Sequence, residues 1–212
     1  MIGDSVYRLQ LFLALAFLVL LSSCASKGVP ISPYDTPAKA LLIMDMQSDF
    51  VGPQAKMPIS EPSKVPLIET INKLSLRARD QGILVIYIRN MFSRDDIANS
   101  FRNRAAIKGN PGSEIDPRVN IVSENLFDKD QPDAFSNPEL EKFLVSHKVN
   151  TLIITGVFAD QCCYYTSWAA LNRNYHVTYI KDAVGSSSDS NIENAAKSLR
   201  EKGASVILSS DL

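Results

Sequence analysis

Histidine and cysteine are both scarce in this chain, which has two histidines and three cysteines among 212 residues. Cys162 and Cys163 are adjacent, and Cys24 lies in an apolar N-terminal segment, so the sequence predicts no disulfide framework. An excess of basic residues is also missing, because the formal net charge is −1 and no basic stripe carries interleaved aromatics. This balance argues against a nucleic-acid partner. The chain also lacks a Gly-rich phosphate loop and an internal repeat.

What remains is the composition of an ordinary globular protein, with 45% hydrophobic and 21% charged residues. This length suits one sizeable α/β core. Apolar runs of strand type alternate with segments that have helical spacing and caps, which predicts a mainly parallel sheet covered on both faces. The expected strands lie at 40–44, 83–88, within 119–127, at 151–155 and at 205–208, and the expected helices at 66–81, from 138 onward, from 167 onward and at 191–202.

Cys162 lies between the apolar run 151–155 and the helical segment that follows it. At the start of a helix, unpaired N–H groups and the helix dipole favour negative charge. Such a position lowers the pKa of a thiol and activates it as a nucleophile, and the same N–H groups can hold an oxyanion. The alternative interpretation is a small buried apolar residue, since free cysteine is often simply buried.

Two further residues belong to the same argument. Asp45 ends the apolar run 40–44, and in doubly wound sheets ligands bind at the carboxyl ends of the strands, so Asp45 is expected in the same crevice as Cys162. Lys129 follows the strand expected within 119–127. Taken alone, the aspartate is equally well explained as a helix cap or loop acid, and the lysine as a solvated surface charge.

Together, these segments resemble the isochorismatase-like cysteine hydrolase family of the nicotinamidase/isochorismatase superfamily. The matching residues, in chain order, are Asp45, Gln47, Asp49, Phe50, Lys129, Phe135, Gly156, Cys162 and Thr166. The resemblance covers about residues 38 to 208 and adds a strand at 175–182 that ends in Asp-Ala. It implies an α/β, three-layer Rossmann-like fold whose mainly parallel sheet has about six strands.

The resemblance also implies a catalytic set. Asp45 would be the proton acceptor, Lys129 would hold it charged and help to lower the thiol pKa, and Cys162 would attack a carbonyl to form a thioester. The oxyanion would be held by the backbone N–H groups of Phe158 and Cys162, with a cis peptide between Val157 and Phe158. The implied substrate is a small-molecule amide or a compound with a related C–N bond.

Three aromatic residues next to the motifs, Phe50, Phe135 and Tyr164, are candidates for the substrate pocket, although core packing explains them equally well. Substrate specificity is expected to come from residues 91–117 and from loops of a partner subunit, so we expect a homo-oligomer. Family members that hydrolyse isochorismate have glycine where this chain has Cys162, which favours amide chemistry. Isochorismate or ester hydrolysis, and a non-catalytic envelope lipoprotein that keeps the fold, remain as alternatives.

No cofactor and no catalytic metal are expected. Nicotinamidases of the family bind a divalent ion through an aspartate and several histidines that lie between the Asp and Lys motifs. This chain has no histidine between Asp45 and Lys129, and its two histidines are His147 and His176. Both are expected at a helix end or on a strand.

The N-terminal segment is expected to lie outside the fold. An apolar run at 9–21 follows Arg8 and ends in Leu-Ser-Ser-Cys24, which looks like a bacterial lipobox. We therefore expect a signal peptide at 1–23, a lipidated tether at 24–37 and the hydrolase domain at 38–212. The protein would be lipid-anchored in the bacterial cell envelope on the periplasmic face, at the outer membrane in a Gram-negative cell. An ordinary cleaved signal and an uncleaved anchor are the alternatives.

Overall fold

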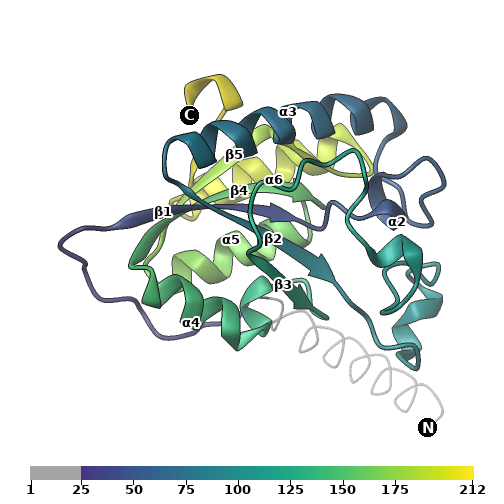
Figure 1. The fold of residues 1–212 in the computed structure, drawn as a ribbon, viewed down its shortest axis with the longest axis horizontal. Coiled ribbons are helices and arrows are strands. Elements are labelled where there is room, and N and C mark those ends of the chain that lie inside the picture. Colours follow the sequence, from purple (N-terminus) through teal and green to yellow (C-terminus); the bar gives the residue numbers. More distant parts are fainter. Residues whose placement is uncertain (1–24) are drawn as a thin grey trace, which may run out of the picture.

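The computed structural model describes residues 25–212 (Figure 1). The predicted signal peptide and the predicted lipidation site, Cys24, lie outside the described residues. Within the described part of the chain, no helix is both long enough and apolar enough to cross a membrane.

A six-stranded sheet with the order β3-β2-β1-β4-β5-β6 forms the centre of the fold, and every neighbouring pair is parallel. This confirms the predicted α/β class. Because the strands are parallel, their carboxyl ends all lie at one edge of the sheet. The strands are β1 (Ala38–Met44), β2 (Leu84–Asn90), β3 (Leu126–Lys129), β4 (Val149–Val157), β5 (His176–Gly185) and β6 (Ser205–Ile207).

Helices cover both faces of this sheet. Alternate side chains of β1 face opposite layers: Leu41 and Ile43 pack in one apolar cluster with α3 (Glu61–Asp80), and Leu42 packs in the other. Figure 1 shows α3 and α4 on opposite sides of the sheet. The second cluster includes apolar side chains from α4 (Pro138–Ser146), α5 (Cys162–Asn172) and α6 (Asp189–Glu201).

Local sequence explains most of these boundaries. The Asn137 side chain accepts a hydrogen bond from the Glu139 N–H and Pro138 follows the cap, as predicted for the start of α4. Helix α3 begins at Glu61 rather than at 66: Pro62 lies in the first turn, where its missing N–H would be unpaired anyway, and the helix continues through Pro66. Helix α6 likewise begins at Asp189 rather than at 191.

Two connecting segments differ from the predicted alternation of strands and helices. β3 occupies only residues 126–129, and the stretch before it runs beside the sheet, with the Ser123 hydroxyl donating to the Val85 carbonyl. The connection from β2 to β3 contains only short 3-10 turns, η2 (Ile97–Ser100) and η3 (Pro111–Ser113). It follows the carboxyl end of β2 and is therefore placed near the site described below.

The segment before β1 also differs from the expected free tether. Residues 25–31, here called the strap, lie on the domain. The N–H and hydroxyl of Ser26 both donate to Asp133, at 2.9 and 2.6 Å. Ala25 and Ile31 pack against the apolar cluster that contains Cys162. The contacts of the domain therefore extend to residue 25, which lies before the expected domain start at 38.

Candidate active site

Three chain segments bring Asp45, Lys129 and Cys162 together at the carboxyl edge of the sheet. Asp45 follows β1, Lys129 ends β3 and Cys162 begins α5, just after β4. The Lys129 Nζ lies 2.9 Å from the Asp45 Oδ2 and 3.3 Å from the Cys162 Sγ. β3 is separated from β1 by β2, so a long side chain is needed to span the distance.

The backbone beside Asp45 requires a glycine. Gly156 on β4 has φ +105°, and a Cβ at this position would lie 2.1 Å from the Met44 carbonyl oxygen on β1. Only glycine allows both this φ and this approach. Asp45 itself has φ +53°, a left-handed conformation that aspartate tolerates better than most residues. Its N–H donates to the Ile88 carbonyl of β2, so both neighbouring strands hold the turn.

The three side chains are buried: those of Asp45 and Lys129 are fully covered, and Cys162 is 6% exposed. Burial raises the pKa of the Asp45 carboxyl, even though the Lys129 charge acts in the opposite direction. Burial also opposes the charge on Lys129, but the neighbouring Asp45 and Cys162 outweigh it and raise the Lys129 pKa. The lysine therefore stays charged between its two partners.

Cys162 corrects the expectation of a lowered thiol pKa. Burial, followed by the nearby Asp45 charge, raises the pKa of the Cys162 thiol to about 11, and Lys129 offsets only part of this. The position at the start of α5 was expected to stabilise the thiolate, but that reasoning omitted desolvation and the neighbouring carboxylate. The resting thiol is therefore protonated at neutral pH and needs a base in order to react.

Asn90 is a fourth member of the site that the sequence reasoning missed. Its Oδ1 accepts from the Lys129 Nζ at 2.6 Å, and its Nδ2 lies 3.7 Å from the Cys162 Sγ. The sequence identified Gln47 only as a motif residue. Its side-chain Nε2 donates to the Asn90 carbonyl and its Oε1 accepts from the Asn90 N–H, both at 2.8 Å. The available signal was the position of Asn90 just beyond the predicted strand 83–88, at the same sheet edge.

The backbone just before Cys162 has the cis peptide that the family resemblance implies. The peptide bond between Val157 and Phe158 is cis. Within residues 25–212, the N–H groups of Phe158 and Cys162 donate to no backbone or side-chain acceptor. Cys163 is fully buried, and its sulfur lies 3.7 Å from the Thr155 carbonyl oxygen, so it faces the strand behind the helix.

Of the three aromatic pocket candidates, only Phe50 lies next to a residue of the site. Its ring packs edge-on against the Phe158 ring, with centroids 5.4 Å apart. The Phe135 ring instead contacts Tyr175 and the Arg173 guanidinium, beyond the C-terminal end of α5. Cys162 begins that helix, so Phe135 is a core residue here.

Tyr164 differs from the expectation in the same way. Its ring packs against Tyr165 and Trp168, and its hydroxyl contacts Ser198 on α6. Helix positions two apart face different sides, and the Tyr164 side chain is directed toward α6.

A cavity of about 310 Å³ lies on the β3 side of Asp45, Lys129 and Cys162. The buried Lys129 side chain faces Asp45 and Cys162, so Lys129 borders the cavity with its backbone. The lining residues are Met91, Lys108, Asp128, Lys129, Asp130, Ser136, Asn137 and Pro138.

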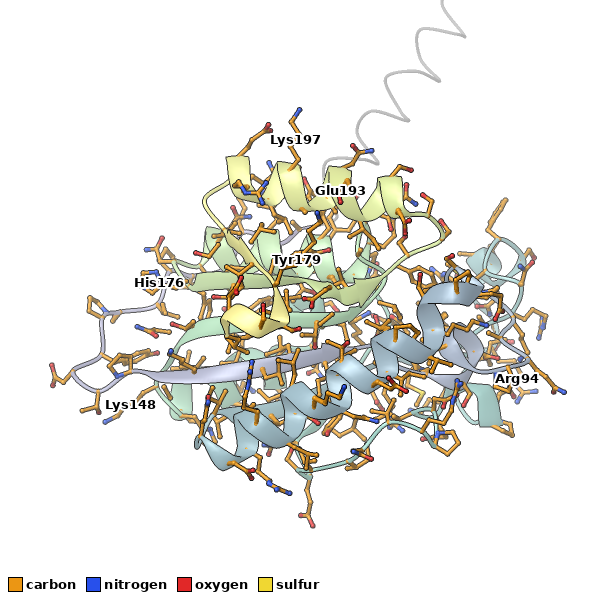
Figure 2. The ribbon with its side chains drawn as sticks, turned by 90° about the horizontal axis from the view of Figure 1, so that it is seen from above. Arg94, Lys148, His176, Tyr179, Glu193 and Lys197 are labelled. Atoms are coloured by element: carbon orange, nitrogen blue, oxygen red, sulfur yellow. The ribbon has the colours of Figure 1, made fainter. Side chains whose placement is uncertain are left out.

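Neither histidine is near Asp45, Lys129 and Cys162, here called the trio. The His147 ring contacts the Phe143 carbonyl at the end of α4, and His176 begins β5. Figure 2 shows His176 at one end of the molecule and Arg94, on the β2–β3 connection, at the other. Across residues 25–212, no three or more His, Cys, Asp or Glu side chains form a group that fits a metal ion. The donor set of a nicotinamidase-type metal site is therefore not assembled by these residues.

Comparisons with known proteins agree with this architecture. N-carbamoylsarcosine amidase from an Arthrobacter species is 24% identical over 157 residues, which cover 69% of this chain and 59% of that protein. A probable inactive nicotinamidase from Arabidopsis thaliana is 32% identical over 157 residues, covering 68% of this chain and 79% of that protein. An isochorismatase-like hydrolase structure from Alkaliphilus metalliredigens has a TM-score of 0.76 at 24% identity, covering 82% of this chain and 96% of that one. The isochorismatase domain family matches residues 39–211, so the chain belongs to the isochorismatase family of hydrolases.

Proposed function

We propose that this protein is a cysteine hydrolase that cleaves an amide or related C–N bond of a small molecule through a thioester intermediate. The observation that carries the proposal is the buried contact of Lys129 with both Asp45 and Cys162, at 2.9 and 3.3 Å. A thiol and a carboxylate placed around one buried cation form a nucleophile with its base. Burying three ionisable groups is costly for a protein that only binds, which argues against the non-catalytic alternative.

In the first half-reaction, the Cys162 sulfur attacks the substrate carbonyl carbon while Asp45 takes the thiol proton. The high thiol pKa makes this transfer part of the attack rather than a step that precedes it. The tetrahedral oxyanion is held by the unpaired N–H groups of Phe158 and Cys162. Asp45 then gives its proton to the leaving nitrogen as the C–N bond breaks, leaving an amine or ammonia and a thioester.

In the second half-reaction, a water molecule attacks the thioester carbonyl and gives a proton to Asp45. The C–S bond breaks, a carboxylic acid leaves, and Cys162 regains the proton. Lys129 stays charged throughout and compensates the negative charge as it moves between Asp45 and the sulfur. The sum is one amide and one water converted to one acid and one amine.

The test is ammonia or amine release from a panel of small amides, with Cys162→Ala and Cys163→Ala as a matched pair. Cys162→Ala should abolish release, while Cys163→Ala should retain most of it, because Cys163 faces Thr155. Acid-quenched intact mass spectrometry should find the acyl group on Cys162 during turnover. Turnover that survives in Cys162→Ala but not in Cys163→Ala would show that the wrong thiol has been assigned.

A further inference from the structure

The strap at residues 25–31 contacts the domain where several active-site segments meet. Besides the two donations from Ser26 to Asp133, the Ser26 carbonyl accepts from Asn172 at 3.2 Å and from Arg173 at 3.1 Å. The Ile31 N–H donates to the Arg173 carbonyl at 2.9 Å. These contacts satisfy the polar backbone atoms at both ends of the strap, as in a folded element rather than a linker.

Gly28 fixes the path of the strap across Arg173. Its φ is +56°, and a Cβ there would lie 2.1 Å from the Arg173 guanidinium carbon. That guanidinium is buried, pairs with Glu141 of α4 at 2.8 Å and covers the Phe135 ring. The strap therefore closes over a junction of α4, α5 and the short turn η4 (Ala134–Ser136).

Asp133 connects this junction to the segments that carry Cys162 and Lys129. One of its carboxylate oxygens accepts from Ser26, and the other accepts from the Phe135 N–H at 2.9 Å and caps η4. The Ala134 N–H donates to the Thr166 hydroxyl at 2.9 Å, and Thr166 lies one turn after Cys162 on α5. On the other side, the Asn137 amide donates to the Asp128 carbonyl, next to Lys129.

We propose that the strap is a positioning element of the active site: through Ser26, Asp133 and η4, it holds the segments that carry Lys129 and Cys162 at their working separation. The strap has no hydrogen bond to Asp45, Lys129 or Cys162, so it acts through η4 and through its contacts with Asn172 and Arg173 at the C-terminal end of α5. The catalytic meaning of this role rests on the proposed function, whereas the mechanical coupling does not.

The test uses the full chain with three variants. Gly28→Val introduces a side chain where Arg173 lies, and Ser26→Pro removes both donors to Asp133. Val29→Ala is the matched control, because Val29 is 77% exposed within the same strap. The first readout is amide hydrogen exchange at residues 134–136, and the second is the rate of iodoacetamide labelling of Cys162. Neither readout needs a substrate, so a failure of the proposed function would leave the test intact.

Gly28→Val and Ser26→Pro should speed exchange at 134–136 by about 30-fold, since the two hydrogen bonds from Ser26 to Asp133, of roughly 1 kcal/mol each, are lost. They should also change Cys162 labelling by about threefold or more, with Val29→Ala unchanged. With an amide substrate in hand, kcat should fall while KM stays near its original value. The proposal is overturned if both variants free residues 25–31 but leave 134–136 and Cys162 as in the unmodified protein. It is equally overturned if neither variant frees the strap.

Discussion

Replacing Asp45 with asparagine should make Cys162 more reactive toward an alkylating reagent and, at the same time, nearly inactive toward an amide. Burial raises the thiol pKa to about 11, and the charge of Asp45 and its hydrogen bond to the thiol act in the same direction. The substitution removes the Asp45 charge and leaves the Lys129 cation 3.3 Å from the sulfur. The Lys129 charge then acts on the sulfur without an opposing carboxylate, so the thiol pKa falls, but no carboxylate is left to carry protons.

The size of both effects follows from the geometry. A single nearby charge shifts a pKa by about one to three units, so a drop of about one to two units is expected for the Cys162 thiol. Since the thiolate is the reactive form, labelling at pH 8 should rise about 10- to 100-fold. Loss of the general base should lower kcat about 10²- to 10⁴-fold.

Labelling by iodoacetamide, followed residue by residue with peptide mass spectrometry, measures the first effect. In the unmodified protein, the labelling rate should keep rising with pH toward about 11 instead of levelling near the value of about 8.5 for a free thiol. In Asp45→Asn the rise should end at lower pH. If labelling and turnover instead fell together in Asp45→Asn, the carboxylate would be assisting thiol ionisation in the resting protein, and the reasoning would be refuted.

Three other predictions follow from the site and from the N-terminal motif. Asn90→Ala should lower the free energy of unfolding in urea by about 1–3 kcal/mol, because the buried Lys129 ammonium loses an acceptor at 2.6 Å. The hydrogen bonds from Gln47 to the backbone of residue 90 remain, so an unchanged urea midpoint would contradict the prediction. Turnover should survive exhaustive chelation, since no histidine lies between residues 45 and 129; loss of activity that zinc, iron or manganese restores would show a metal requirement. Mass spectrometry of the natively expressed protein should find cleavage before Cys24 and lipid on its thiol, whereas an intact Met1 or an unmodified Cys24 would exclude the lipoprotein assignment.

The fold and the meeting of Asp45 with Cys162 at one sheet edge were accessible from the sequence for a simple reason, whereas Lys129 was singled out only by the family resemblance. Asp45 directly follows a buried apolar run, Cys162 lies a short turn after another, and parallel strands bring their carboxyl ends to one edge whatever the loops do. The thiol pKa was not accessible in this way. Its direction depends on how completely the sulfur is covered and on its distance from Asp45, and both arise from packing between segments far apart in the chain.

Adjacency along the chain was the least reliable guide. Phe135 is a motif residue and Tyr164 lies two positions after Cys162, yet their rings pack on Tyr175 and on Trp168. The strap was missed for the opposite reason. Its composition is typical of a linker, and the contact that holds it joins Ser26 to Asp133, 107 positions away. Neither relation leaves a local pattern in the sequence.

The docked strap changes what an attachment at Cys24 would mean for the geometry of the enzyme. A free linker of residues 24–37 would let the domain move roughly 20 Å away from the bilayer and rotate freely. With the chain held from residue 25 onward, an extended reach of about 4 Å per free residue remains. A lipid at Cys24 would therefore keep the surface around residue 25 close to the bilayer, so that encounters between copies would be confined to a plane.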